Sequence, residues 1–385
     1  MNKIVKRVLI ISGIAVGTIV LAAGSFVGYV LLSYYRIGNT SVGIDSHATN
    51  EVAKIGQTYK ALSYNIGFGA YSQDFTFFLD EGYDINGNKT CGHSSWAKSK
   101  EEVLKNVNGA INVVAKEKPN FVFFQEVDTD STRSYRVNQD KMIQDTFTDY
   151  DHIHCSNFHT SFLPYPLYQM HGIVNSGLTT ISNLKLNDAK RVEYTVSTEF
   201  NKYFDLDRCF CTSYVEVENG KKLYIVNSHM SAYDEGGKIR SKQVAELNSF
   251  LSKVKENGDY AVVGGDWNHD LLTNNPDFHY DLENKPFGVK LKDPDWISPY
   301  FNSEKMSLCA DGFKVVTSDN HPTCRNNDIE YEEGVTYVCN ADGFVVSENI
   351  NVKSCNVIQT EGGNKNLKGF SFSDHDPIEF EFELM

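Results

Sequence analysis

The chain has 385 residues, of which 36 are basic and 50 acidic, and its formal net charge is −14 at pH 7. The first 36 residues hold four of the basic side chains and no acidic one, which leaves 32 basic and 50 acidic residues in the remainder. This balance disfavours proteins that hold extended nucleic acid mainly through its phosphates, because these usually carry a basic patch or stripe. It does not exclude a nuclease, since a bound divalent cation can dominate the local field.

The first predicted element is an apolar helix. Residues 8–32 carry no charged side chain, and at about 1.5 Å per residue they are long enough to cross a hydrocarbon core of roughly 30 Å. Three basic residues precede this run: Lys3, Lys6 and Arg7. The positive-inside bias therefore predicts that residues 1–36 form a cytoplasmic basic tip and a single-pass anchor in the cell membrane, with the rest of the chain outside. The alternative is a cleaved signal peptide and a secreted protein, although the apolar part of such peptides is usually about 7 to 15 residues long.

The remainder is predicted to consist of a linker and one domain. Residues 37–57 are rich in Gly, Ser, Thr and Asn, which predicts a flexible linker. Residues 58–385 contain no internal repeat and have the length of one large two-sheet sandwich. They hold all eight cysteines, which in an exported domain indicate disulfides, with a pairing that the sequence does not define.

Four short apolar runs each end in a potential ligand or proton carrier. The residues that follow these runs are Asn65, Glu126, His229 and Asp266. A buried strand of this length brings the next polar side chain to the edge of its sheet. Each signal is weak alone, because a strand-end Glu is usually solvated and an Asp-x-Asn is usually a turn. Their ordered recurrence favours a functional site.

Helices and turns between these runs are also predicted. Apolar residues recur at helical spacing over residues 99–119, which begin with a capping box, and over residues 239–254. Asn219-Gly220 is a strong hairpin-turn dipeptide and places His229 at the end of the second strand of the hairpin. Residues 271–302 are irregular and rich in Asp, Asn and Pro, so we expect a surface insertion near the site.

An apolar, aromatic and proline-broken segment covers residues 162–168. Three placements are open for it: in a lipid interface, where Tyr is enriched, at the rim of a site where it stacks on bases, or folded onto the domain. Arg133 is a second isolated feature, since its guanidinium could contact a phosphate group.

The residue types in these motifs suit phosphoester hydrolysis. That reaction brings a nucleophile to an anionic centre, so it needs a cation to neutralise developing charge and a group that readies water. Carboxylate and amide oxygens are suitable ligands for a hard cation such as Mg²⁺. Two C-terminal residues, Asp374 and His375 in Ser373-Asp374-His375-Asp376-Pro377, add a carboxylate and an imidazole.

The order of these motifs resembles that of the endonuclease/exonuclease/phosphatase superfamily, which includes DNase I-like nucleases, bacterial sphingomyelinases and inositol-polyphosphate 5-phosphatases. The resemblance covers residues 58–385 and implies a four-layered α/β/β/α sandwich of two mixed sheets, with the site at one end. It also implies a divalent-metal-dependent phosphoester hydrolase that uses Mg²⁺, with Mn²⁺ or Ca²⁺ as alternatives. The resemblance implies three metal ligands: Asn65, Glu126 and Asp342. Gly343 stands where the family usually has an aromatic residue after that last aspartate.

The resemblance also implies five catalytic residues: His229, Asp266, Asn268, Asp374 and His375. Asp266 would orient or deprotonate the attacking water, and Asn268 would position the phosphate. The two histidines would stabilise the charge of the scissile phosphate, with Asp374 holding the imidazole of His375 in the useful tautomer. Asn175 resembles the family's phosphate-contacting asparagine.

Three functions are left open by these observations. The first is a membrane-anchored phosphoesterase that faces outside and acts on a phospholipid-type or other small phosphorylated substrate, with the lipid bilayer as partner through the N-terminal helix. Asn227-Ser228-His229 favours it, because abasic-site endonucleases generally lack that histidine. The second is a surface nuclease that cleaves DNA or RNA. The third is a binding protein that has lost catalysis, and no protein partner is predicted for any of the three.

Overall fold

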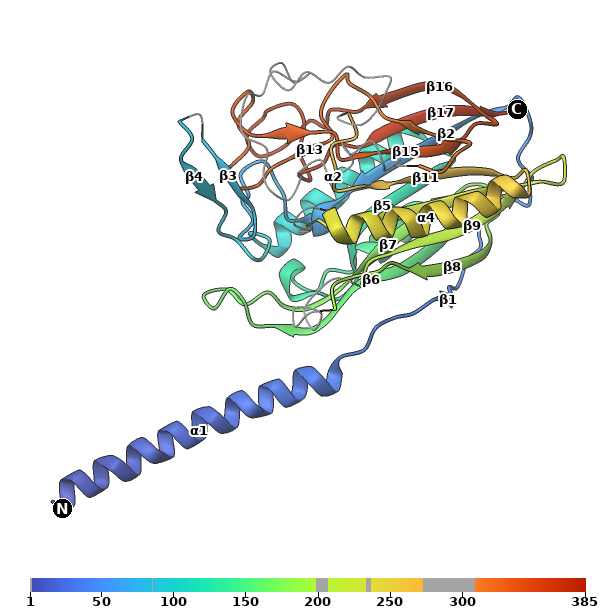
Figure 1. Ribbon diagram of the computed structural model, residues 1–385. Helices are drawn as coiled ribbons and strands as arrows, with labels where there is room; N and C mark the ends of the chain where they lie inside the picture. The colour runs from blue at the N-terminus through green and yellow to red at the C-terminus, as the bar shows by residue number, and fades with distance from the viewer. Residues whose placement is uncertain (1, 85, 199–206, 233–236, 273–308) are drawn as a thin grey trace.

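A computed structural model of the chain describes residues 2–84, 86–198, 207–232, 237–272 and 309–385. Two large mixed β-sheets pack face to face, and helix α1 (Lys3–Ser33) projects from this body (Figure 1). The predicted insertion at residues 271–302 lies almost wholly outside the described residues.

The first sheet has seven strands, which in spatial order are β1 (Thr40–Ser41), β8 (Asn187–Glu193), β9 (Cys209–Glu216), β10 (Lys222–His229), β11 (Tyr260–Asp266), β15 (Asp342–Ser347) and β12 (Phe313–Val316). The second has six, in the order β16 (Ile350–Val357), β17 (Ile378–Leu384), β2 (Thr58–Asn65), β5 (Phe121–Asp128), β7 (Gly172–Ser182) and β6 (Asp151–Leu163). Two small sheets pair β3 (Glu81–Tyr83) with β4 (Lys89–Cys91) and β13 (Cys324–Arg325) with β14 (Val338–Cys339).

Helices cover the outer faces of both large sheets. The apolar stripe of α2 (Lys100–Glu117) packs on β2 and β5 with the help of α3 (Gln139–Thr146), and that of α4 (Lys238–Glu256) packs on β10 and β11. Between the sheets lies a third apolar cluster, in which the rings of Phe123 and Phe344 meet edge to face at 6.3 Å. These layers confirm the predicted four-layered α/β/β/α sandwich.

The predicted local elements are present. Ser99 caps α2, because its hydroxyl accepts a hydrogen bond from the Glu102 amide at 3.1 Å, and α4 covers the predicted range 239–254. Strands β9 and β10 pair in antiparallel fashion across the Asn219-Gly220 turn. Each element therefore forms where its own sequence signal lies.

Residues 37–57, predicted to be a flexible linker, instead lie along the folded domain. Strand β1 pairs with β8, and isolated bridges join Asp45 to His152 and Ala53 to Val217. The carboxylate of Asp151 accepts hydrogen bonds from the amides of His47 and Ala48. The apolar residues of this segment show little periodicity because the segment is irregular, although it is bound to the edges of the sheets. Composition alone does not distinguish such a segment from a free chain.

The eight cysteines are all free thiols in the structure, so the expected disulfides are not formed. The sulfur atoms of Cys155 and Cys209 lie 3.9 Å apart in the apolar layer between the sheets.

One buried amide joins the two sheets beneath the strand ends. Asn227 on β10 donates to the carbonyl oxygens of Phe124 and Thr179, both at 3.1 Å, and accepts from the Gln125 amide at 2.9 Å. These partners belong to β5 and β7 of the other sheet, and all of them are buried. A buried network of this kind stabilises the fold only while each member keeps its partner.

Asn227→Leu is expected to lower the free energy of unfolding by about 3 kcal/mol, because it leaves buried carbonyl and amide groups without partners. Urea denaturation followed by circular dichroism measures the change. Asn219→Leu, in the exposed turn that precedes the same strand, is the control and should change stability much less. Equal stability of the Asn227 variant and the unmodified protein would contradict a structural role for this bridge.

Candidate active site

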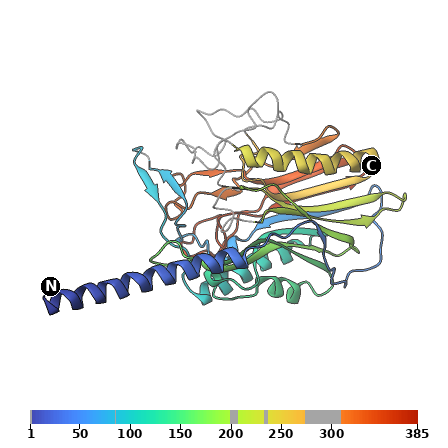
Figure 2. The same cartoon turned by 60° about the horizontal axis from the view of Figure 1, so that its bottom comes forward.

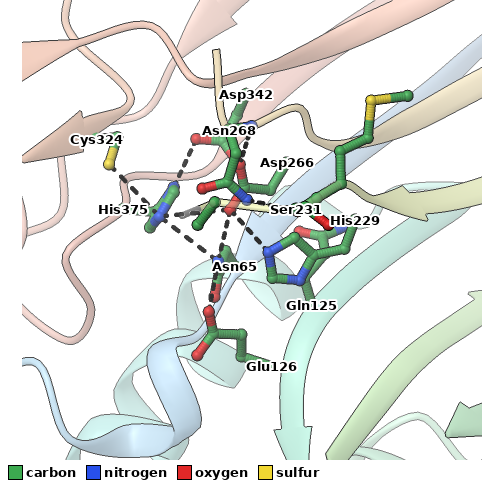
Figure 3. Close-up of polar contacts among 12 residues, drawn as sticks. Asn65, Gln125, Glu126, His229, Ser231, Asp266, Asn268, Cys324, Asp342 and His375 are labelled. Carbon is green, nitrogen blue, oxygen red and sulfur yellow. Dashed lines mark hydrogen bonds and ion pairs between the residues drawn. The ribbon is translucent and has the colours of Figure 1, made fainter. Parts of the chain in front are cut away.

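Strand register brings the predicted polar residues to one end of the sandwich. Parallel pairing of β10 with β11 sets His229 opposite Asp266, and antiparallel pairing of β11 with β15 sets Asp266 opposite Asp342. In the other sheet, parallel pairing of β2 with β5 sets Asn65 opposite Gln125, next to Glu126. Figure 3 shows the resulting cluster, with His375 on the opposite side of Asp266 from His229.

Glu126 points into this cluster because β5 is irregular there. Its φ angle is 55°, and the register of β5 against β7 shifts between Phe124 and Val127. A bulge of this kind re-aims one side chain, and a non-glycine residue in the left-handed region costs about 1–3 kcal/mol. The Glu126 carboxylate accepts a hydrogen bond from the Asn65 amide at 3.4 Å. The strain thus occurs at the residue that was predicted to bind metal.

Asp266 is the centre of the polar network. Its Oδ2 accepts a hydrogen bond from Asn65 Nδ2 at 2.9 Å and lies 3.3 Å from His229 Nε2 and 3.8 Å from His375 Nε2. Its Oδ1 accepts from the backbone N–H of Asn268 at 2.8 Å. Burial acts to raise the pKa of Asp266, but the two histidines and this N–H outweigh it and hold the pKa below its usual range. Asp266 is therefore ionised at neutral pH.

The partner of His375 differs from the prediction. His375 Nδ1 lies 2.7 Å from Asp342 Oδ2, whereas the Asp374 carboxylate accepts from the Asn327 amide at 2.8 Å. The expectation that Asp374 orients His375 is therefore wrong, and Asp342 does so instead. Burial acts to lower the pKa of His375, but Asp342 and the other acidic groups around it raise the pKa above its usual value. The acidic groups around His375 therefore favour its protonated form.

His229 is in the opposite state. Burial and the nearby Arg208 guanidinium lower its pKa despite the attraction of Asp266, so the imidazole is neutral at neutral pH. Its Nδ1 is buried and has no hydrogen-bond partner in the described structure. The pKa values of the two histidines that flank Asp266 are thus shifted in opposite directions, because burial and Arg208 dominate at His229 and acidic groups dominate at His375.

Asn268 follows β11 with a φ of 48°, another left-handed non-glycine residue. Its side-chain amide donates to the Met230 carbonyl at 2.8 Å, and its own carbonyl accepts from Arg240 Nη1 at 2.6 Å. These bonds hold the turn in which Asn268 donates its N–H to Asp266, so part of its role is to position that carboxylate.

The cluster opens into a pocket of about 200 Å³. Seven of the predicted residues line it: Glu126, Arg133, His229, Asp266, Asn268, Asp374 and His375. Its other lining residues include the apolar side chains of Phe77, Phe78 and Leu163 and a second buried arginine, Arg325.

Of the two predicted substrate-binding residues, one lines the pocket and the other does not. Arg133 lines the pocket, but it is buried and its guanidinium is held by the Asp128 carboxylate, with Nε and Nη2 at 3.1 and 2.9 Å. Asn175 is not among the lining residues, and its amide donates to the Asp130 carbonyl at 2.9 Å. Its neighbour Ser176 on β7 lines the pocket instead, with a buried hydroxyl that has no hydrogen-bond partner in the described structure.

Several pocket residues lie outside the predicted motifs. Cys324 is the clearest example, since its sulfur lies 3.5 Å from His375 Nε2 although it is 51 residues away in the chain. Arg325, Asn327 and Asn157 also line the pocket. None of these follows an apolar run, so the strand-end pattern gives no signal for them.

The residues present fit a divalent cation. Asp266, Asp342 and His375 each offer a ligand atom, and these atoms lie within 4.8 Å of one another, although only the two carboxylates can bind a cation while His375 is protonated. Asp342 Oδ1 is buried without a hydrogen-bond partner in the described structure, and Glu126 contributes a further carboxylate beside Asn65. Carboxylates and amides are the donors that hard cations prefer. Asn65 directs its nitrogen toward the acids, so it would bind a cation only with its amide turned over.

No model of a known protein family matches the sequence, and no curated protein sequence matches it. Solved structures do resemble it. ANGEL2, described as a 2′,3′-cyclic phosphatase and solved with adenosine-2′,3′-vanadate, is 14% identical with a TM-score of 0.53, over 85% of this chain and 96% of that chain. TDP2 from D. rerio, solved with a single-strand DNA product, is 13% identical with a TM-score of 0.52, over 85% of this chain and 99% of that chain. Truncated TDP2 from Caenorhabditis elegans is 14% identical with a TM-score of 0.51, over 86% of this chain and all of that chain. At such identities the likeness shows the fold.

Proposed function

We propose that this chain, which has the DNase I-like fold of the endonuclease/exonuclease/phosphatase superfamily, is a divalent-metal-dependent phosphoester hydrolase. The observation that carries the proposal is the buried carboxylate of Asp266 between His229 and His375, with Glu126 beside it. Buried acids and imidazoles at one pocket are costly for a fold and are typical of catalysis. The intact set argues against a binding protein that has lost catalysis.

The residues would divide the work as follows. Glu126, with Asp342 and Asn65, would hold Mg²⁺, Mn²⁺ or Ca²⁺, and the ion would supply charge neutralisation and lower the pKa of water. Asp266, being ionised, accepts a hydrogen bond from the attacking water and orients it. His375, protonated beside Asp342, donates a charge-assisted hydrogen bond to a phosphoryl oxygen. Neutral His229 lies on the other side of Asp266, next to the proposed position of the phosphoryl group. Asn268 keeps the Asp266 carboxylate in place through its backbone N–H.

The substrate that we propose is a phospholipid-type or other small phosphorylated molecule. Support comes from the apolar wall formed by Phe77, Phe78 and Leu163, which suits an apolar group next to a phosphate, and from the acidic balance of the chain. Nucleic acid is the second candidate. It is favoured by the single-strand DNA product bound to TDP2 and by the arginines in the pocket wall.

The proposed location is a membrane, with α1 as a single-pass anchor and the catalytic domain outside the cell. Helix α1 is long and apolar enough to span a bilayer, a property shared by signal sequences. Helix α1 extends away from the domain (Figure 2), and among its residues only Val30 is buried, so most of its apolar side chains are exposed. A helix that is apolar on every face requires an apolar environment.

The test is hydrolysis by the full-length protein in vesicles, with Mg²⁺, of a panel that contains sphingomyelin, other phospholipids, inositol phosphates, DNA and RNA. We expect turnover of a lipid or small phosphoester. Preferred cleavage of nucleic acid would replace this substrate assignment with the second candidate, and hydrolysis of none of these compounds would contradict it.

Metal removal gives a second expected result. Dialysis against a chelator should abolish turnover, and added Mg²⁺ or Mn²⁺ should restore it. Metal at about one hundred times its dissociation constant should also stabilise the folded domain by about 2.7 kcal/mol, which calorimetry detects as a higher Tm. Full activity after complete chelation would contradict the proposed metal dependence.

A further inference from the structure

The segment between β6 and β7 presents an unusual surface. We call residues 164–171 the β6–β7 loop, and four of its apolar or aromatic side chains are exposed: Tyr165 (58%), Leu167 (77%), Tyr168 (72%) and Met170 (40%). No charged residue occurs from 160 to 170. Single exposed apolar residues are ordinary, but a contiguous group is typical of an interaction surface.

Hydrogen bonds hold this loop in its exposed position. The Tyr168 hydroxyl donates to the His93 carbonyl at 2.6 Å, and the Trp96 indole N–H donates to the Met170 carbonyl at 2.7 Å. The Tyr168 ring is therefore presented to the outside while its hydroxyl is satisfied. The loop is therefore attached to the domain, because the Tyr168 hydroxyl and the Met170 carbonyl are both hydrogen-bonded to it.

The same surface is continuous with the end of α1. The rings of Phe26 on α1 and Phe162 on β6 meet edge to face with centroids 6.4 Å apart. The ring centroids of Tyr35 and His159 lie 4.5 Å apart. In Figure 1, α1 leaves the domain on the side of β6. The chain runs from Phe162 directly into the β6–β7 loop, so helix and loop belong to one face of the molecule.

The number of apolar residues in α1 determines how deep this face of the domain would lie relative to a bilayer. About 20 helical residues cross a hydrocarbon core, so a span that begins at Val8 ends near Val27. Tyr29, Tyr34 and Tyr35 follow, and tyrosines are enriched at membrane interfaces. Phe26, and with it Phe162, then lies at the boundary between acyl chains and headgroups.

We propose that the β6–β7 loop is a second membrane contact of the folded domain, seated in the interface of the leaflet from which α1 emerges. The occupant of this surface is lipid, because an uncharged aromatic and aliphatic surface beside an interfacial helix end is what such an interface accepts. Helix α1 and the loop then fix two points of the domain, and together they restrict its tilt on the membrane.

The contact also places the mouth of the catalytic pocket. Leu163 and His171, on either side of the loop, line the pocket, and the Tyr165 ring lies 5.7 Å from that of Phe78, which lines it too. With the loop in the interface, the pocket opens at headgroup level. This consequence rests on the proposed function and implies that the scissile phosphate belongs to a membrane lipid.

The membrane contact is tested with the full-length protein in phosphatidylcholine vesicles whose acyl chains carry bromine, which quenches nearby tryptophan. The emission added by Leu167→Trp should fall by about half or more relative to vesicles without bromine, as expected for an interfacial ring. Met385→Trp is the matched control, because this exposed C-terminal residue lies at the far end of the domain (Figures 1 and 2), and its emission should not change. Equal quenching at the two positions would overturn the proposal.

A second measurement separates the membrane contact from the chemistry. Leu167→Ser combined with Met170→Ser should lower turnover of a bilayer phosphoester about tenfold and leave a water-soluble phosphoester unaffected, since both side chains are exposed and only their apolar burial in lipid is lost. Leu104→Ser, an exposed position on α2, should affect neither. Equal loss on both substrates would overturn the proposal in favour of a role within the protein. Should no phosphoester be hydrolysed, the quenching result still decides the contact, and only the proposed function fails.

Discussion

Asp266→Asn is expected to lower kcat by about a thousandfold or more, while the domain remains folded. The substitution keeps an oxygen that can accept the Asn268 N–H, but it removes the charge that lies between His229 and His375. An uncharged amide neither orients water as a strong acceptor nor balances a protonated imidazole, and losses of about 10²–10⁴ are usual for such groups. Steady-state hydrolysis of the preferred substrate, with circular dichroism as the folding check, measures the effect.

A control for this substitution lies just before the same strand. Asp259 precedes β11 at the end opposite to Asp266, and its carboxylate accepts from the Lys222 N–H at 3.0 Å. Asp259→Asn makes the same chemical change far from the pocket, so kcat should stay within about twofold of the unmodified protein. Wild-type turnover by the folded Asp266→Asn protein would show that another group orients the water.

Glu126→Gln is expected to weaken metal binding by about a hundredfold or more and to abolish turnover at ordinary Mg²⁺ concentration. Glutamine has nearly the same shape, so the left-handed backbone at this position and the hydrogen bond to Asn65 can persist while the charge is lost. A hard divalent cation depends on ligand charge for much of its affinity. Metal titration followed by calorimetry measures the binding, and hydrolysis over a Mg²⁺ series measures the function.

The matched control is Glu117→Gln at the end of α2, where the carboxylate pairs with Lys60 at 3.5 Å on the surface. Exposed ion pairs contribute little, so this variant should bind metal and hydrolyse substrate normally. If Glu126→Gln bound metal as tightly as the unmodified protein, the assignment of Glu126 as a ligand would be wrong.

The main elements of the fold could be predicted because their signals are local. The apolar runs before Asn65, Glu126, His229 and Asp266 all form strands, since their side chains are buried between or beneath the sheets. The spacing of residues 99–119 and 239–254 is helical for the same reason. Burial patterns of this kind depend on neighbours in sequence, which a single sequence displays.

Pairing across the site could not be predicted in the same way. The partner of His375 is Asp342, 33 residues earlier, and this choice depends on the register of β15 against β11. Asp374 is adjacent to His375 in the chain, but its carboxylate accepts a hydrogen bond from the Asn327 amide. The bulge that turns Glu126 inward and the ion pair that holds Arg133 likewise arise from tertiary contacts.

The docking of residues 37–57 along the sheets determines how far the domain can move from its anchor. Only six residues, 34–39, separate α1 from β1, and fully extended they reach about 20 Å. Even this short stretch is held, because Arg36 pairs with Asp207 at 3.6 Å and Arg191 binds the Gly38 carbonyl at 3.2 Å. With α1 in a bilayer, this short connection keeps the domain close to the membrane surface. The domain would then meet substrates by lateral diffusion within that membrane, and a molecule elsewhere would have to reach the membrane by its own diffusion.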